Sequence, residues 1–171
     1  MLKPRDYQLE NIKEVLEKLQ LHQRCMYYAP TGAGKTTFAA LLAKEAVKYG
    51  RQIRFYVHRD KLVNQTVNTF RKVGLKCGIV AGGYKYHRGC PVQVISVQTL
   101  SSGHRDFTWL ETGDRKPLSM VDECHITQYY DVMQELFPML PNERTAEDEG
   151  FVIGLTGTPW RLKRDESMGQ F

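Results

Sequence analysis

The sequence predicts an α/β domain in which helices cover both faces of a mostly parallel sheet. Short apolar runs, typical of buried strands, alternate along the chain with longer segments whose apolar residues recur at helical spacing. A glycine-rich turn joins the first strand-like run to a helix-like segment. With 171 residues, the chain has the size of one ordinary domain.

The elements are predicted in order from spacing and turn residues. Helical spacing predicts helices over 6–21, 35–49, 60–73 and 128–137. Apolar runs bounded by turn residues predict strands at 25–28, 53–57, 77–80, 92–97, 118–121 and 151–155. The polar, turn-rich stretches 101–116 and 138–150 are expected to be long loops.

The loops that follow the strands are expected to share one edge of the sheet. Right-handed crossovers between parallel strands place these loops together, and open α/β sheets bind ligands at that edge. The prediction therefore gathers four side chains there: Lys35, Asp122, Glu123 and Thr156.

The glycine-rich turn reads Ala-Pro-Thr-Gly-Ala-Gly-Lys-Thr from Ala29 to Thr36 and predicts a phosphate-binding loop. Gly32 and Gly34 allow the backbone to approach a phosphate, and the N–H groups at the start of the helix form a concave anion site. Lys35 would reach the β and γ phosphates of ATP, and the Thr36 hydroxyl would ligate Mg²⁺. Ala29 stands where the strict pattern has glycine.

An acidic motif follows the predicted strand at 118–121 and reads Asp-Glu-Cys-His from Asp122 to His125. In phosphate-loop enzymes an aspartate at the end of a neighbouring strand holds Mg²⁺, and a following carboxylate polarises the attacking water. Asp122 and Glu123 fit these roles. Taken alone, such a pair is more often a solvated turn or a charge pair at a helix start. The nearby phosphate loop favours the catalytic interpretation.

The composition suits a basic, cytoplasmic protein. The formal net charge of +5 and the pI near 9.0 are compatible with nucleic acid as a partner. No apolar run approaches the ~20 residues that cross a bilayer, and the N-terminus lacks signal-peptide features, so no membrane partner is expected. The cysteines include no C-x-x-C pair, which predicts reduced thiols in a reducing compartment.

With these motifs in place, the chain resembles the first RecA-like domain of a superfamily II helicase or nucleic-acid translocase. The segment 5–8 resembles the upstream adenine-contacting motif, 30–36 resembles motif I, and 57–63 with Gln65 resembles motif Ia. The segment 96–100 resembles motif Ib or Ic, 122–125 resembles motif II, and 154–159 resembles motif III. The matches span nearly the whole chain, in the order in which that superfamily carries them.

The resemblance implies a role for each matched position. Arg5 and Gln8 would hold adenine, and the phosphates would lie against Pro30, Thr31, Gly32, Ala33, Gly34, Lys35, Thr36 and Thr37. His125, Thr156 and Thr158 would couple nucleotide state to nucleic acid, which His58, Arg59, Lys61, Gln98 and Thr99 would contact. Residues 1–162 would form the ATP-binding lobe. Residues 163–171 would begin a linker to an absent second lobe that supplies an arginine, so the isolated lobe is expected to be nearly inactive.

The resemblance implies an ATP-dependent helicase or translocase but does not decide whether it moves on DNA or RNA. The Arg-Asp-Tyr-Gln start and the Leu-Thr-Gly-Thr-Pro-Trp-Arg ending are similar to the DNA-directed branch, which includes transcription-repair helicases and type I restriction translocases. Asp-Glu-Cys-His also occurs in flaviviral RNA helicases, so RNA stays open. A phosphate-loop ATPase that ignores nucleic acid is an alternative, as is a degenerate lobe. Retention of Lys35, Asp122 and Glu123 speaks against degeneration.

A glycine turn at Gly82 and Gly83 precedes a basic and aromatic segment, Tyr84–Arg88. Aromatic rings interleaved with cations suit base stacking combined with phosphate contact. The same composition is equally typical of a solvated hairpin tip. Both interpretations are open at the level of sequence.

Overall fold

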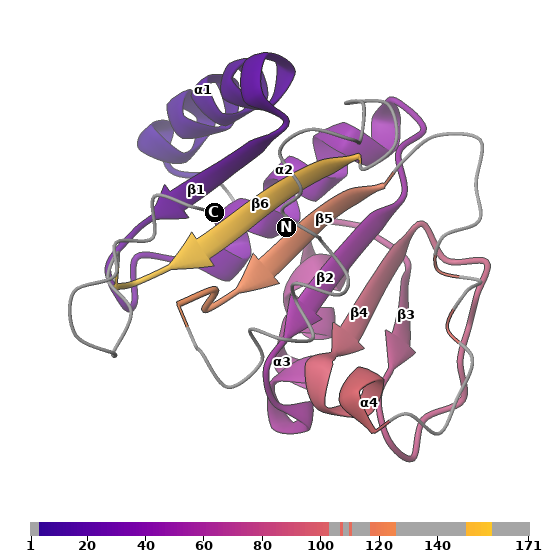
Figure 1. Cartoon of the computed structure of the whole chain (residues 1–171). Coiled ribbons are helices and arrows are strands. Elements are labelled where there is room, and N and C mark those ends of the chain that lie inside the picture. The colour runs from indigo at the N-terminus through magenta and orange to yellow at the C-terminus, as the bar shows by residue number, and fades with distance from the viewer. Residues whose placement is uncertain (1–3, 103–106, 108–109, 111–116, 126–149, 159–171) are drawn as a thin grey trace, which may run out of the picture.

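The computed structural model describes residues 4–102, 107, 110, 117–125 and 150–158. The helices in this part are α1 (Asp6–His22), α2 (Lys35–Lys48), α3 (Asp60–Lys72) and α4 (Val97–Ser101). The strands are β1 (Arg24–Tyr28), β2 (Ile53–Val57), β3 (Cys77–Val80), β4 (Val92–Ser96), β5 (Leu118–Asp122) and β6 (Phe151–Thr156). Figure 1 shows their arrangement.

The strands form a single parallel sheet in the order β1-β6-β5-β2-β4-β3. The register pairs Tyr28 of β1 with Thr156 of β6, and Asp122 of β5 with Leu155 of β6. All carboxyl ends therefore lie at one edge, as predicted, and the strands β1, β6 and β5 that carry the phosphate-loop and acidic motifs are neighbours. The predicted α/β fold with a mostly parallel sheet is confirmed.

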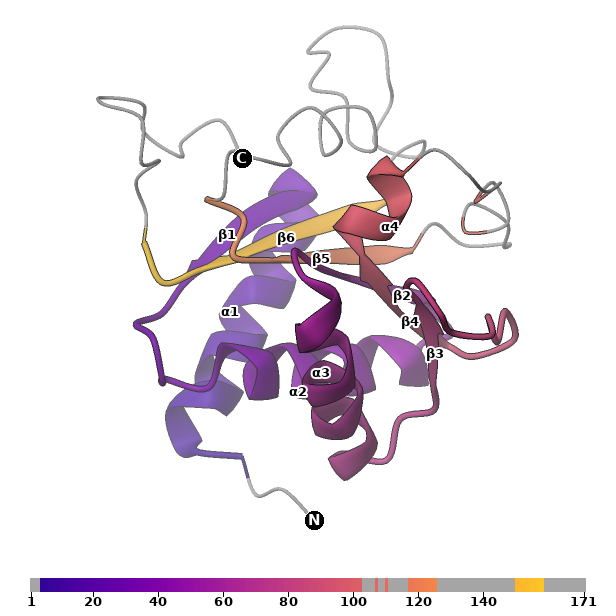
Figure 2. The same cartoon turned by 90° about the horizontal axis from the view of Figure 1, so that it is seen from below.

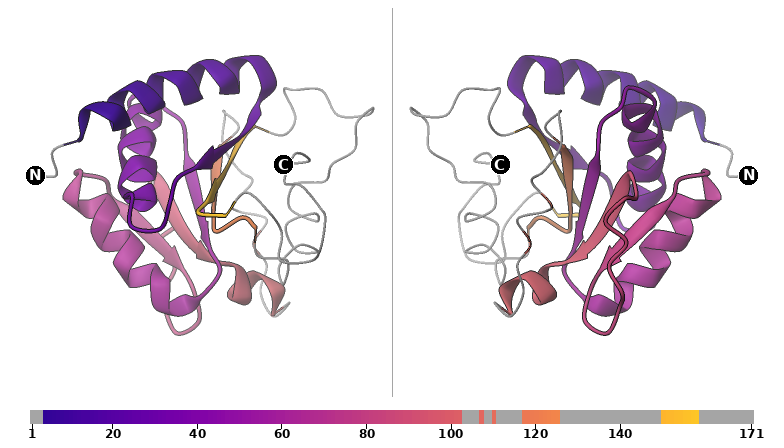
Figure 3. Two further views of the ribbon diagram at one scale, coloured as in Figure 1. Left: turned by 90° about the vertical axis from the view of Figure 1, so that its left-hand side faces the viewer. Right: turned by 90° about the vertical axis from the view of Figure 1, so that its right-hand side faces the viewer.

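Three helices cover one face of this sheet. Figure 2 and Figure 3 show α1, α2 and α3 on one side and the short α4 on the other. Side chains of successive strand residues point to opposite faces, so Phe55 packs edge-on against Phe70 of α3 while Tyr56 enters a smaller cluster on the α4 side. The larger core lies between the sheet and the long helices, where Phe38 and Leu42 of α2 are fully buried.

The predicted helices and strands that fall in the described residues begin and end within one or two residues of the observed ones. One prediction was wrong: Val97 was placed at the end of a strand, whereas it begins α4. A helix of five residues has too few turns to show helical periodicity, and Val92–Val97 reads as one apolar run. The expected helix at 128–137 lies outside the described residues, as do the tail 163–171 and most of the two long loops.

All four cysteines lie in the described part of the chain. All four cysteines are free of disulfides. Burial raises the pKa of Cys25 and of Cys77 to about 11, so both thiols stay protonated and unreactive at neutral pH. Within the described ranges, none of the helices combines the length and the hydrophobicity that crossing a membrane requires.

Candidate functional site

The phosphate loop connects β1 to the start of α2. Gly32 and Gly34 both have φ of +83°, a left-handed conformation that side chains other than glycine rarely adopt. Gly34 caps α2, and its carbonyl accepts the first helical hydrogen bond from the Phe38 N–H at 2.9 Å. The Phe38 ring stacks on Tyr27 with centroids 3.8 Å apart, which fixes the helix against the strand. This packing therefore fixes the position of the N–H groups at the start of α2, which are available to an anion.

Lys35 brings the phosphate loop and the acidic motif into contact. Its side chain is 8% exposed, and its Nζ lies 3.4 Å from the Ala29 carbonyl oxygen and 3.5 Å from Glu123 Oε1. A Cβ added at Gly157 would stand 3.1 Å from the same Nζ. Residues far apart in sequence thus surround one ammonium group, as the shared sheet edge predicted.

Asp122 and Glu123 form an acidic pair at the end of β5. Burial, with the neighbouring Glu123 charge as a second cause, raises the pKa of Asp122 to about 6, and Lys35 opposes the shift. Glu123 adopts a φ of +49°, a strained conformation for a residue with a side chain and one that tends to occur at functional sites. Carboxylate and hydroxyl oxygens are the ligands that Mg²⁺ prefers, so Asp122 and Thr36 fit a magnesium site by chemistry.

A buried hydroxyl connects the acidic motif to the end of β6. Thr156 Oγ1 donates to the Thr158 carbonyl at 2.6 Å and accepts from the Thr158 N–H at 2.9 Å. Because the hydroxyl proton is used, His125 Nδ1, at 2.8 Å, must donate to the same oxygen. The same Nδ1 lies 3.4 Å from Glu123 Oε2. Hydrogen bonds therefore link the expected coupling residues His125, Thr156 and Thr158, and His125 also lies beside Glu123.

The start of α1 packs against the phosphate loop. Gln8 is 3% exposed, its Oε1 accepts from the Arg5 N–H at 3.0 Å, and its Nε2 lies beside Gly34. Tyr7 donates from its hydroxyl to the Ala33 carbonyl at 3.0 Å and receives a hydrogen bond from Arg5 at 3.3 Å. The structure thus places Arg5 and Gln8 at the loop, and adds Tyr7, which motif spacing alone did not indicate.

The expected nucleic-acid residues follow β2 and β4 at the same sheet edge. Arg59 precedes α3 and is exposed, and Gln98 is exposed on α4. Thr99 Oγ1 accepts from the Gly82 N–H at 3.0 Å, so it anchors the glycine turn. In the segment after that turn, the Tyr84 hydroxyl accepts from Asn64 of α3 at 2.6 Å.

His58 differs from the other members of that group. Its Nδ1 is buried and has no hydrogen-bond partner within the described part of the chain. Burial and the adjacent Arg59 lower the pKa of His58, while Glu123 raises it and His125 lowers it. The charges of the acidic motif therefore affect the pKa of His58, in addition to the effect of Arg59. The resemblance to motif Ia did not predict this influence.

Replacing Thr156 by Val should destabilise the chain. Thr156 is fully buried, so the loss of its hydroxyl leaves the Thr158 N–H and His125 Nδ1 without this partner. We expect the free energy of unfolding in urea to fall by about 1–3 kcal/mol. The matched control is Thr69→Val, which removes one exposed hydroxyl bond to the Gln65 carbonyl and should change the free energy by less than about 0.5 kcal/mol. Equal effects of the two substitutions would contradict a structural role for this hydroxyl.

The raised pKa of Asp122 predicts a pH dependence of stability. Unfolded Asp122 releases its proton near 3.8, whereas the folded chain retains it to about 6. The folded state binds more protons between these values, so Asp122 lowers the free energy of unfolding as pH rises from about 4 to about 6. Unfolding of the wild type and of Asp122→Asn should be compared across this window. The wild type should lose stability relative to the variant as pH rises, and the opposite trend would contradict the assigned shift.

The comparisons with known proteins agree with this arrangement. The family described as "Type III restriction enzyme, res subunit" matches residues 1–161. The chain belongs to this family. A curated relative, a 51.5 kDa protein of Lactococcus phage (isolate 7-9), is 27% identical over 143 residues. The match covers 82% of this chain and 25% of the phage protein, so the chain spans about a quarter of that relative's length.

Solved structures show the same fold within longer proteins. A nuclease-deletion mutant of the Type ISP restriction-modification enzyme LlaGI, in complex with a DNA substrate mimic, matches with a TM-score of 0.64 and 15% identity, over 99% of this chain and 20% of the enzyme. The Pyrococcus furiosus Hef helicase domain matches with a TM-score of 0.66 and 22% identity, over 98% and 34%. These structures confirm the fold, and the family match over residues 1–161 confirms the resemblance to superfamily II helicases and restriction translocases.

Proposed function

We propose that this chain is the ATP-binding lobe of an ATP-dependent nucleic-acid helicase or translocase. Arg5 and Gln8 bind adenine, and the loop from Pro30 to Thr37 binds the phosphates. Thr36 and Asp122 would hold Mg²⁺, which when bound would neutralise charge that develops on the phosphoryl group.

The observation that carries this proposal is the meeting of Lys35 with Glu123 at 3.5 Å. Lys35 is the first residue of α2, and Glu123 lies in the turn after β5. The Lys35 Nζ also contacts the Ala29 carbonyl oxygen, and the Glu123 carboxylate also lies near His125. Lys35 provides positive charge for the β and γ phosphates, and Glu123 orients the attacking water and accepts its proton. A structural ion pair alone would not require a strained φ at Glu123.

The coupling between nucleotide and nucleic acid runs through His125. Its Nδ1 donates to Thr156 and lies near Glu123, so a movement of the Glu123 carboxylate changes the hydrogen bonding of Thr156 and Thr158. Coupling of this kind needs an element with two arrangements that both ligands bias. The network from Glu123 to Thr158 is that element in our proposal.

DNA is the proposed track, with His58, Arg59, Gln98 and Thr99 as contacts. Support comes from the exposure of Arg59 and Gln98 at the sheet edge, from the net charge of +5, and from the DNA substrate mimic bound by the LlaGI mutant. RNA recognition is the alternative, because the motif letters occur in both kinds of helicase. We further propose residues 1–162 as the lobe and 163–171 as the start of a linker to a second lobe.

The nucleic-acid surface can be tested by Arg59→Ala. Removing one phosphate contact should weaken binding of single-stranded DNA to a similar degree for all sequences and reduce the salt dependence of the affinity by about one ion. Fluorescence anisotropy titrations at several salt concentrations measure both effects. Arg71→Ala is the matched control, since Arg71 lies exposed at the other end of α3. An Arg71 variant that weakens binding as much as the Arg59 variant would refute the assigned surface.

A further inference from the structure

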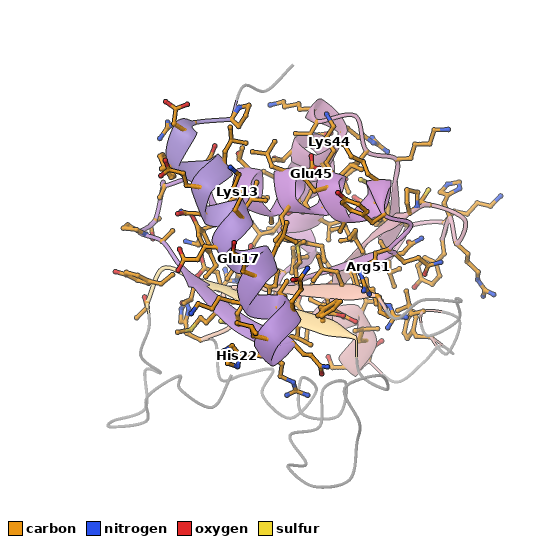
Figure 4. The ribbon with its side chains drawn as sticks, turned by 90° about the horizontal axis from the view of Figure 1, so that it is seen from above. Lys13, Glu17, His22, Lys44, Glu45 and Arg51 are labelled. Carbon is orange, nitrogen blue, oxygen red and sulfur yellow. The ribbon has the colours of Figure 1, made fainter. Side chains whose placement is uncertain are left out.

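A concave surface lies between α1 and α2, on the face of the molecule that the helices cover. It consists of two adjoining pockets, of about 540 Å³ and 360 Å³, that share Leu16 and Glu45. We call it the α1–α2 hollow. Its apolar lining comes from α1, α2 and the starts of two strands and includes Leu9, Ile12, Leu16, Leu41, Tyr49 and Phe151. Figure 4 shows the face on which α1 and α2 meet.

Two large apolar side chains of the hollow are open to solvent. Leu9 of α1 is 47% exposed, and Tyr49, directly after α2, is 71% exposed. Each lines a different pocket of the pair. Exposed apolar residues that border a concave surface mark interaction sites more often than isolated exposed residues do. The hollow is therefore suited to a partner that covers apolar area at both ends.

The charged side chains that line the hollow are mainly basic. Lys13 of α1 and Lys44 and Lys48 of α2 line the first pocket, and Arg51 lines the second, with its guanidinium 4.3 Å from the centre of the Phe151 ring. Among the lining residues, Glu45 is the acidic one, and it accepts a hydrogen bond from Lys48 at 2.7 Å. Figure 4 shows Lys13 and Lys44 on the two helices. A complementary partner carries acidic groups.

The backbone of the hollow limits the conformation of that partner. The walls are the sides of two helices, whose N–H and C=O groups are bonded within the helices. An extended segment laid on these walls would find no backbone partners, whereas a helix satisfies its own. We propose that the α1–α2 hollow binds an amphipathic helix of a partner protein, apolar on the contacting face and acidic along its edges.

This surface also reaches the elements of the nucleotide site. The same α1 carries Gln8 against the phosphate loop, and the same α2 begins at Lys35. A partner helix bound in the hollow would contact α1 and α2 but would not enter the phosphate loop. Binding of the partner helix does not depend on the proposed helicase or translocase function, so experiments can refute either proposal without the other.

The test is binding of labelled synthetic peptides to the 171-residue chain, followed by fluorescence anisotropy. The acidic peptide has about 15 residues, with Leu at helical spacing and Glu beside the Leu stripe. A second peptide keeps the Leu residues and replaces each Glu by Lys. We expect saturable binding of the acidic peptide and affinity at least about tenfold lower for the basic one.

Variants locate the binding. Leu9→Ser and Tyr49→Ser should each weaken the acidic peptide about fivefold or more, and Lys44→Glu should do the same. The controls are Leu21→Ser, an apolar residue of α1 that is 73% exposed and outside the lining, and Lys76→Glu, an exposed lysine after α3. Neither control should change the affinity. These positions are at the surface, so the variants should fold.

Other outcomes overturn the proposal. Equal affinity for both peptides, no saturation up to about 1 mM, or equal effects of hollow and control variants would each do so. Displacement of the acidic peptide by single-stranded DNA would assign the basic side chains to nucleic acid instead. Self-association that is lost in Leu9→Ser would assign the hollow to a second copy of the chain.

Discussion

Lys35→Ala is expected to lower the affinity for ATP about 10- to 100-fold. The Lys35 ammonium lies at the centre of the phosphate loop, within 3.5 Å of both the Ala29 carbonyl and Glu123. Hydrogen bonds from a charged group to a phosphate contribute roughly 1.5–3 kcal/mol each, and the variant loses them. Titration of the chain with a fluorescent ATP analogue in the presence of Mg²⁺ measures the change.

The control for this substitution lies on the same helix. Lys48 is exposed in the last turn of α2, so Lys48→Ala removes a lysine of equal charge far along the helix from the loop. It should leave nucleotide affinity unchanged. A similar loss in both variants would mean that general charge, rather than the position of Lys35, governs binding.

Glu123→Gln is expected to keep nucleotide affinity within a few-fold and to lower ATP turnover about 10²- to 10⁴-fold. The amide oxygen can still accept from Lys35, whose Nζ lies 3.5 Å from Oε1, while an amide nitrogen replaces the oxygen that lies 3.4 Å from His125 Nδ1. It cannot accept the proton of an attacking water, and loss of a general base costs this much in rate. Turnover has to be measured in the longest natural protein that contains this chain, because an arginine from a second lobe is part of the proposed site.

The contrast between the two variants is the informative result. Lys35→Ala should fail at binding and Glu123→Gln at turnover. If Glu123→Gln lost affinity as strongly as Lys35→Ala, Glu123 would hold the loop in shape instead of acting on water. If it kept full turnover, a different group would be the base.

Much of the fold could be predicted from the sequence because the local signals are strong. The strand predicted at 118–121 is confirmed as β5, because a short apolar run bounded by turn and charged residues is typical of a buried strand. The shared edge of Lys35, Asp122, Glu123 and Thr156 followed from the handedness of parallel crossovers. The strand order itself, with β6 between β1 and β5, depends on tertiary packing that no local pattern contains.

The details of the site needed side-chain contacts. The contact between Tyr7 and Ala33 joins residues 26 positions apart, and the sequence around Tyr7 carries no sign of it. The motif assigns His58 to nucleic acid, but the structure also shows that its Nδ1 is buried and that the charges of Glu123 and His125 affect its pKa. The α1–α2 hollow lies between side chains of two helices that are separate in the sequence, so neither helix alone indicates it.

The most direct test of the central proposal is ATP turnover by the longest natural protein that contains this chain, without nucleic acid and then with single-stranded DNA, duplex DNA or RNA. We expect low turnover alone and strong stimulation by DNA, abolished by Glu123→Gln. Stimulation by RNA alone would keep the motor and change its track. Turnover that is indifferent to every nucleic acid would contradict the proposed motor function and identify an ATPase that does not act on nucleic acid.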